Sequence, residues 1–404
     1  MPTRRSSLNG CRVTRFAVAV LALMLATLGV GPGARAHDPS AYGGLFRSRN
    51  LGGTWLNADV GLFVNAALTV ALDPHDPNHL LMGTDTGLLR SQNGGRSWMP
   101  EAQSLILGPV FAIAFGPDGE NAICSAPSGV FIYDHGRWRR ATAPDEAAPA
   151  RAIAFGATAD RVYLLGNRGL FASDDRGEHF GRVQNGLAPD ARMTVLAVAT
   201  EPQEILFAVI DGKLMASGDG GRQWHFCIGS GGTSVDTGVL DPAWPSRVWA
   251  ASADQIYVSD DLGVSWRPVG KRLPEPKTDV RGIAADRTAA TLVVTTHRGM
   301  YLSEDAGSSW VLKEGNLPIH LEAGPLVRDW QDARTLYAVY SLMPYPEVWR
   351  TALQGGSLLA RVDKLSLAGG LAFIVLLVMC GALLVLWLER RRSAAPSPRR
   401  GSLL

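Results

Sequence analysis

One turn motif recurs along this chain at a nearly constant interval, and that interval constrains the fold more than any other feature. The motif reads Ser-x-Asp/Asn-x-Gly-x-x-Trp/Phe, and it occurs six times: Ser48–Trp55, Ser91–Trp98, Ser173–Phe180, Ser217–Trp224, Ser259–Trp266 and Ser303–Trp310. A degenerate copy, Tyr133–Trp138, fills the one gap of double length, so that the aromatic positions are 40 to 44 residues apart. Repeats of this length are typical of four-stranded propeller blades.

Within a repeat, short apolar segments alternate with turn-forming residues. In the first complete repeat we predict strands at Ala66–Leu72 and Leu80–Gly83, with the turn cluster Asp73–Asn78 between them. Leu88–Ser91 is the third predicted strand, and the motif then turns the chain into a fourth strand that begins at Ser97. Short strands at even spacing favour an all-β array over β-α-β units.

The residue types of the motif have a structural explanation that requires no ligand. A short carboxylate or amide side chain accepts hydrogen bonds from backbone N–H groups two residues further on. Glycine supplies a positive φ angle, and the aromatic residue packs between blades. We therefore expect the Asp or Asn of each motif to be a scaffold residue: Asn50, Asn93, Asp175, Asp219, Asp261 and Asp305.

These motifs resemble the Asp-box, or bacterial neuraminidase repeat, of sialidases, sortilins, xyloglucan-active glucanases and the photosystem II assembly and stability factors. The resemblance covers about residues 43 to 355. It implies that the motifs lie on the turn between third and fourth strands, on the face opposite the functional groove. The uniform repeats and the turn Asp73–Pro77 are most similar to those of the photosystem II factors, and sialidases and sortilins are more distant.

The ends of the repeat region indicate the number of blades. One strand, Gly44–Arg47, precedes the first motif, and three predicted strands follow the last: Pro325–Arg328, Thr335–Tyr340 and Glu347–Arg350. If the amino-terminal strands complete the carboxy-terminal ones, the ring closes without an exposed edge. We therefore predict a seven-bladed β-propeller over residues 37–360. Eight blades are the alternative, because Val348–Arg350 duplicates the strand position that Leu45–Arg47 fills.

Both ends of the chain predict a membrane-anchored, exported protein. Residues 1–36 have the basic start, the apolar segment and the Ala-Arg-Ala cleavage site of a signal peptide. Leu365–Leu388 contains 24 residues without a charge, which is long enough for one transmembrane helix. Residues 389–404 form a basic tail, which the positive-inside rule places in the cytoplasm. The expected location is the cell membrane, with the propeller in the periplasm.

Candidate binding residues lie on the connections of one face of the predicted ring. Ligands are expected where the first strands begin and where the chain turns from second to third strands. The charged residues there are the predicted binding residues: Arg168, Arg281, Arg298, Asp85, Asp211 and Asp254. Arg151, Arg192 and Arg328 are expected near the same inner strands. The alternative is that the aspartates are simply turn formers.

No catalytic residue, metal ligand or cofactor is predicted. The Arg-Ile-Pro segment that accompanies sialidase repeats is absent, since Phe46–Ser48 leads directly into the first motif. A glycosidase requires two carboxylates about 5–9.5 Å apart, and only Asp85, Asp211 and Asp254 are candidates for such a pair. The net charge of +2 gives no reason to expect nucleic acid as a partner.

The expected function is therefore a non-catalytic binding or assembly scaffold for a membrane protein complex, whose partner is a protein. An exo-acting glycosidase of the sialidase type and a receptor for carbohydrate or peptide are the alternatives.

Overall fold

The computed structural model describes residues 43–354, except residues 60–61, 63, 189–190, 229–233, 241–243, 277 and 319. The predicted signal peptide, transmembrane segment and basic tail lie outside the described residues. No helix in the described part is long and apolar enough to cross a membrane. The chain divides into two units, Met1–Val348 and Trp349–Leu404, and all described strands belong to the first unit.

Six blades follow one another along the chain, each with four antiparallel strands in sequence order. The first three blades are formed by β3 (Ala67–Leu72), β4 (Leu80–Thr84), β5 (Leu88–Ser91) and β6 (Met99–Glu101); β7 (Ala112–Phe115), β8 (Ala122–Ala126), β9 (Gly129–Asp134) and β10 (Arg137–Arg140); and β11 (Ala152–Phe155), β12 (Val162–Gly166), β13 (Gly169–Ser173) and β14 (Gly181–Arg182). A short 3₁₀ helix, η2 (Asp145–Ala147), connects the second blade to the third.

The next three blades are formed by β15 (Met193–Ala199), β16 (Ile205–Ile210), β17 (Lys213–Ser217) and β18 (His225–Ile228); β19 (Thr237–Leu240), β20 (Val248–Ser252), β21 (Gln255–Ser259) and β22 (Arg267–Val269); and β23 (Val280–Ala285), β24 (Leu292–Thr296), β25 (Gly299–Ser303) and β26 (Val311–Leu312).

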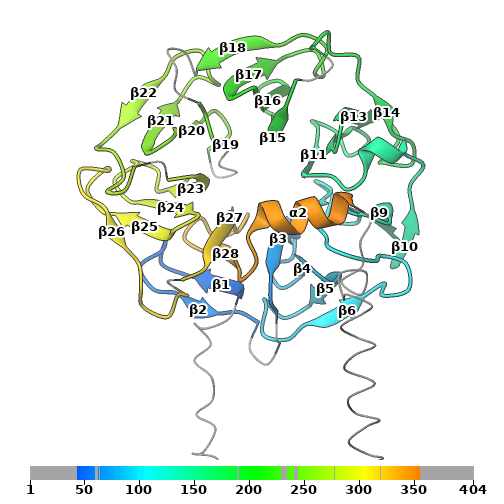
Figure 1. Ribbon diagram of the computed structural model, residues 1–404, viewed down its shortest axis with the longest axis horizontal. Helices are drawn as coiled ribbons and strands as arrows, with labels where there is room; N and C mark the ends of the chain where they lie inside the picture. The colour runs from blue at the N-terminus through cyan, green and yellow to red at the C-terminus, as the bar shows by residue number, and fades with distance from the viewer. Residues whose placement is uncertain are drawn as a thin grey trace, which may run out of the picture. The chain divides into compact units, whose positions relative to one another are not determined.

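The seventh blade joins the two ends of the repeat region. Its strands run from the inside outwards as β27 (Glu322–Arg328), β28 (Leu336–Ser341), β1 (Gly44–Ser48) and β2 (Leu56–Asn57). β1 pairs with β28 over five positions, from Gly44 opposite Tyr340 to Ser48 opposite Leu336. The inner strands of successive blades contact one another, and β27 contacts β3 to close the ring (Figure 1). The prediction of an all-β propeller with seven blades is confirmed for the described residues.

The predicted strand Glu347–Arg350 is wrong. These residues lie in a helix, α2 (Tyr345–Leu353). The edge of β28 that a further strand would need is already paired with β1, so no strand position remains for an eighth blade. Pro346 lies in the first turn of the helix, where the missing N–H of proline is tolerated.

Burial explains why each repeat forms a blade. Every residue of the second strands β4, β8, β12, β20 and β24 is buried. The fourth strands β6 and β14 are mostly exposed. Two of the largest fully buried side chains, Trp249 and Tyr163, come from second strands. Fully burying one large apolar side chain stabilises the fold by about 1.5–3 kcal/mol.

The same hydrogen-bond network occurs in all six Asp-box turns, and its centre is the serine. In the fifth blade, the Ser259 hydroxyl donates to Asp261 Oδ1 over 2.7 Å and accepts from the Gly263 backbone N–H over 2.7 Å. Asp261 Oδ1 also accepts from the backbone N–H of Ser265 over 2.9 Å. The carboxylate therefore reaches four residues along the chain, not the two that the sequence predicts. In each of the six boxes the motif asparagine or aspartate accepts a backbone hydrogen bond from the residue four positions on.

The glycine of each box lies against the preceding blade. Gly52, Gly177 and Gly221 have φ angles of +83°, +89° and +86°, a region that other residues avoid. A Cβ atom on any of them would collide with a side chain of the preceding blade: Val293, Ile123 and Leu170 respectively. The motif requires glycine both for the backbone angle and for the close approach of two blades.

Replacing Gly221 by alanine should destabilise the protein, because the backbone would be strained and the new methyl group would meet Leu170. Backbone strain of this kind costs about 1–3 kcal/mol. Gly218 lies in the same turn and has no atom within 4 Å of its Cβ position, so Gly218→Ala is the matched control. We expect Gly221→Ala to lower the Tm in thermal unfolding while Gly218→Ala leaves it unchanged; equal Tm values would contradict this role.

Asp261 should contribute stability that is lost in acid. Hydrogen bonds from Ser265 and Ser259 lower its pKa from 3.8 to about 2, so the contribution is present above pH 3.8 and disappears as the pH falls through 2. Asparagine fits the same turn, since Asn93 accepts from the Ser97 N–H and donates to its hydroxyl. We expect the Tm of Asp261→Asn, relative to wild type, to rise as the pH falls from about 4 to about 2. A constant difference would refute the assignment.

Candidate functional site in the central cavity

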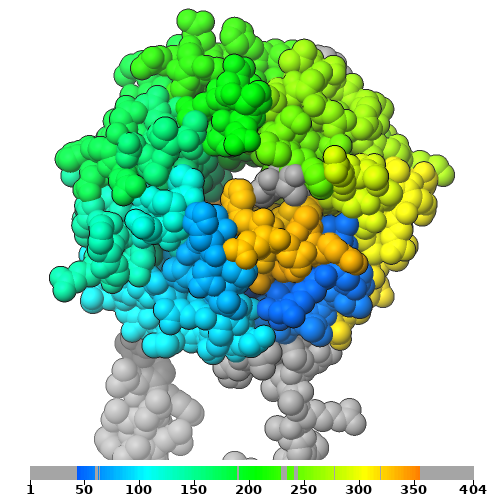
Figure 2. Space-filling view, turned by 180° about the vertical axis from the view of Figure 1, so that it is seen from behind, coloured from blue at the N-terminus to red at the C-terminus, as the bar shows by residue number. Residues whose placement is uncertain are grey.

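A cavity of about 620 Å³ opens at the centre of the ring, where the space-filling view shows an opening between the blades (Figure 2). Its lining residues lie where the first strands begin and in the turn from β16 to β17. Because neighbouring strands are antiparallel, these positions are at the opposite end of the blades from the Asp-box turns. The cavity thus lies on the face to which the sequence assigns ligand binding.

Three arginines line the cavity, and each is placed by the start of a first strand. Arg151 precedes β11, Arg192 precedes β15, and Arg281 is the second residue of β23. Arg281 Nη1 donates to Glu322 Oε2 over 2.8 Å, across the sixth and seventh blades. Burial lowers the pKa of Arg151, and the like charge of Arg192 acts in the same direction.

Asp236 and Asp279 supply negative charge to the same cavity. They precede β19 and β23, the first strands of the fifth and sixth blades. Burial raises the pKa of Asp236 from 3.8 to about 6, and the charge of Asp279 acts in the same direction. The Ala253 N–H donates to Asp236 Oδ2 over 2.8 Å, which fixes the carboxylate. Asp211 also lines the cavity and accepts from the Arg192 backbone N–H over 2.9 Å.

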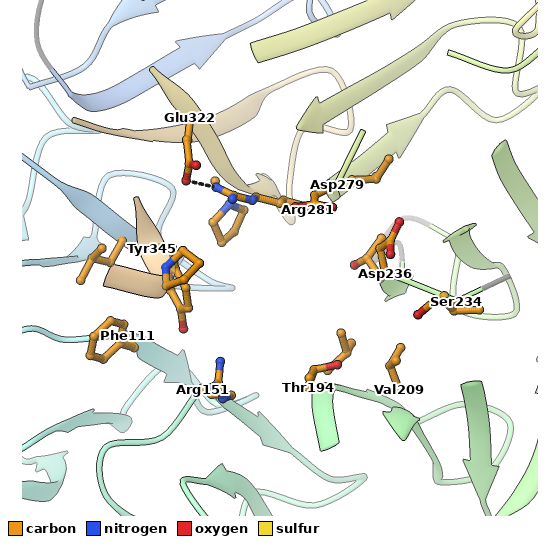
Figure 3. Close-up of a pocket in the computed structure, with 18 of the residues that line it drawn as sticks. Phe111, Arg151, Thr194, Val209, Ser234, Asp236, Asp279, Arg281, Glu322 and Tyr345 are labelled. Atoms are coloured by element: carbon orange, nitrogen blue, oxygen red, sulfur yellow. Dashed lines mark hydrogen bonds and ion pairs between the residues drawn. The ribbon is translucent and has the colours of Figure 1, made fainter. Parts of the chain in front are cut away.

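Two aromatic rings complete the lining. Phe111 and Tyr345 meet edge to face, with ring centroids 5.3 Å apart. Burial raises the pKa of Tyr345 to about 12, so its hydroxyl is neutral at physiological pH. Tyr345 and Phe111 lie on one side of the cavity, and Asp236 and Asp279 lie on the other (Figure 3). The cavity therefore has an aromatic side and an acidic side.

The structure brings two of the six predicted binding residues into the cavity lining, Arg281 and Asp211. Arg168 and Arg298 are exposed on the turns from β12 to β13 and from β24 to β25, and Arg298 pairs with Glu275. Asp85 lies in the turn from β4 to β5, where burial raises its pKa. Asp254 lies in the turn from β20 to β21 and forms an ion pair of 2.7 Å with Arg272.

Arg328 does not lie near the cavity mouth, contrary to expectation. It is the last residue of β27, at the end of the blade that carries the Asp-box turns. Its guanidinium is buried and donates to the carbonyl oxygens of Ala285 over 2.6 Å and of Ala333. Arg328 thus joins the sixth and seventh blades from within.

The sequence interpretation missed five lining residues: Asp236, Asp279, Glu322, Phe111 and Tyr345. A signal for the first four exists, since each lies immediately before or at the start of a first strand, the position that also identifies Arg151. Tyr345 follows the last strand and has no counterpart in the other repeats. Within the described residues, no group of three or more His, Cys, Asp or Glu side chains is arranged to hold a metal ion.

Solved structures of other propellers share this fold at low sequence identity. YCF48 bound to D1 peptide is 17% identical with a TM-score of 0.53, over 69% of this chain and 95% of that chain. YCF48 from Cyanidioschyzon merolae is 12% identical with a TM-score of 0.55, over 69% of this chain and 97% of that chain.

A GH74 xyloglucanase from Xanthomonas campestris is 18% identical with a TM-score of 0.52, over 69% of this chain. This chain spans 53% of the xyloglucanase, about half its length. No protein-family profile matches the chain, and no curated protein matches it. The comparisons identify the chain as a seven-bladed β-propeller similar in fold to YCF48 and to the xyloglucanase propeller.

The pKa of Asp236 should be measurable by NMR titration of its carboxyl carbon, with a midpoint near 6. Asp279→Asn removes the neighbouring negative charge, so it should lower that midpoint without returning it to 3.8, because burial is the larger cause. Asp254→Asn, on a carboxylate already paired with Arg272, should leave the midpoint unchanged. An unchanged midpoint in Asp279→Asn would show that the two carboxylates do not interact.

Proposed function

We propose that this protein is a non-catalytic binding scaffold that docks an exposed peptide segment of a membrane protein complex in its central cavity. The observation that carries the proposal is the cavity lining, which combines arginines, carboxylates and an aromatic pair. Peptide segments present charged side chains, apolar side chains and backbone amides together. A concave site with a few fixed polar groups and aromatic walls suits such a ligand.

The comparison with YCF48 supports this proposal. A propeller of the same fold, of which this chain covers 95%, has been solved bound to D1 peptide. The described residues thus form a propeller of similar extent to that structure. A single propeller that binds a peptide is therefore an architecture with a solved precedent.

The sequence supports a membrane setting for the partner. The proposed signal peptide at residues 1–36 exports the propeller, and the proposed transmembrane helix Leu365–Leu388 anchors it. The basic tail after Leu388 would stay in the cytoplasm. A propeller tethered in this way meets the extracytoplasmic segments of other membrane proteins at high effective concentration.

Site-specific photocrosslinking in intact cells tests the proposed docking site. A photoreactive amino acid at Thr194, which lines the cavity, should crosslink to a subunit of a membrane complex. The matched control is Val264, which is 85% exposed in an Asp-box turn on the opposite face. We expect a defined adduct from position 194 and none from position 264. Identical adducts from both positions, or none from position 194, would exclude the cavity as the docking site.

A glycosidase is the second candidate, and one observation favours it. Burial raises the pKa of Asp236 to about 6, and the charge of Asp279 acts in the same direction. A carboxyl group with a raised pKa beside a second carboxylate is the usual acid and base arrangement of glycoside hydrolysis. The fold likeness to a xyloglucanase points the same way. Hydrolysis of xyloglucan or a sialoside by the purified protein, abolished in Asp236→Asn, would replace the scaffold proposal. We expect no hydrolysis above the rate of that variant.

A further inference from the structure

We propose that the acidic side of the central cavity recognises a positively charged side chain, lysine or arginine, of the docked segment, seated between Asp236 and Asp279. The inference rests on the proposed function and adds the chemical class of the group that is recognised. It also orients the docked segment. With its basic residue at the acidic side of the cavity, the neighbouring residues of the segment face the aromatic side.

Charge is distributed unevenly around the cavity. Asp211, Asp236 and Asp279 come from the fourth, fifth and sixth blades, so they follow one arc of the ring. The other acidic lining residue, Glu322, is paired with Arg281 at 2.8 Å, and these two charges offset each other. Among the described lining residues, the arc from Asp211 to Asp279 therefore carries more negative than positive charge.

Hydrogen bonds hold the Asp236 carboxylate and the Asp279 backbone in place. The Asp236 N–H donates to the Ala251 carbonyl oxygen over 2.8 Å, and its Oδ2 accepts from the Ala253 N–H over 2.8 Å. The Asp279 N–H donates to His297 Nδ1 over 3.0 Å. Within the described residues, neither carboxylate forms an ion pair with a protein cation. The Asp236 carboxylate is thus fixed before a ligand arrives, which reduces the ordering cost of binding.

Electrostatics make a cation the favoured occupant. Two like charges in a partly buried site repel each other, and a cation between them offsets that repulsion. The cation also replaces the favourable contact with water that each carboxylate loses on burial. The charged and titratable groups around Asp236 are Asp211 and Arg192 on the fourth blade and Asp279, Arg281 and His297 on the sixth. Arg281 forms an ion pair with Glu322, and the Asp211 side chain accepts a hydrogen bond from the Arg192 backbone N–H. Asp236 and Asp279 are left to meet the ligand.

The proposal has a consequence for pH dependence. Asp236 attracts a cation only when ionised, and its pKa in the empty cavity is about 6. Binding should be full above this pH and weaken as the pH falls through it. With binding proportional to the ionised fraction, affinity at about pH 5 should be about tenfold lower than at about pH 7.5.

Selection from a random seven-residue peptide library on the full-length protein in detergent micelles tests the inference. We expect lysine or arginine to be enriched at one position of the selected peptides. Asp236→Asn and Asp279→Asn should each lose this enrichment. The matched control is Asp254→Asn, which removes a carboxylate paired with Arg272 outside the cavity lining and should select the same peptides as wild type.

The affinity of one enriched peptide, measured at both pH values, completes the test. The wild-type affinity should fall about tenfold in acid, while Asp236→Asn should show no such change. Selection of peptides without a preferred basic position, or unchanged selection by both cavity variants, would overturn the inference and leave the docking proposal standing. If no peptide is selected and Thr194 gives no crosslink, both proposals fail.

Discussion

The propeller depends on the contact between each Asp-box and the blade before it. The box serine is buried and satisfies two backbone N–H groups of its own turn, as in Ser217 with Asp219 and Gly221. This leaves the turn compact enough for its glycine to approach a side chain of the preceding blade. The same turn therefore satisfies its backbone N–H groups and packs closely against the preceding blade, and this arrangement is repeated in the six boxes. Neighbouring blades need this contact, because four short strands alone bury too little surface to hold the adjacent blade in place.

This arrangement explains how one molecule can have a rigid face and a variable face. The six third-to-fourth turns that carry an Asp-box have the same task, so their residue types are constrained by geometry. The connections on the other face have no shared task, and they differ in charge and length from blade to blade. Arg151, Arg192, Asp236 and Asp279 occupy equivalent places before first strands, yet their charges differ, since the third and fourth blades carry arginine there and the fifth and sixth carry aspartate. A scaffold that fixes one end of each strand leaves the other end free to acquire a binding site.

The fold could be predicted from sequence because each repeat contains its own strands, turns and box, all of them local features. The failure at Glu347–Arg350 has a non-local cause: β1, almost 300 residues earlier, occupies the edge that those residues would need. The cavity was predictable in part for the same reason. Arg281 and Asp211 were found from their connections, but Asp236 and Asp279 look like ordinary turn residues until neighbouring blades bring them together. Arg168 and Arg298 lie on turns from second to third strands, as Asp211 does, and spacing along the chain does not show which of these turns reaches the cavity.

The closing blade has a consequence for how the protein is made. β1 and β2 are the first described strands to be synthesised and pair with each other, but the other edge of β1 has no partner until β28, which ends at Ser341, has been added. Six blades can form while the chain grows, yet the ring stays open and that edge of β1 remains unpaired. A chain cut short anywhere before Ser341 therefore exposes a strand edge at its amino end, which proteases and chaperones recognise. Only complete chains close, so the joining of the two ends acts as a check that synthesis has reached the end of the last blade.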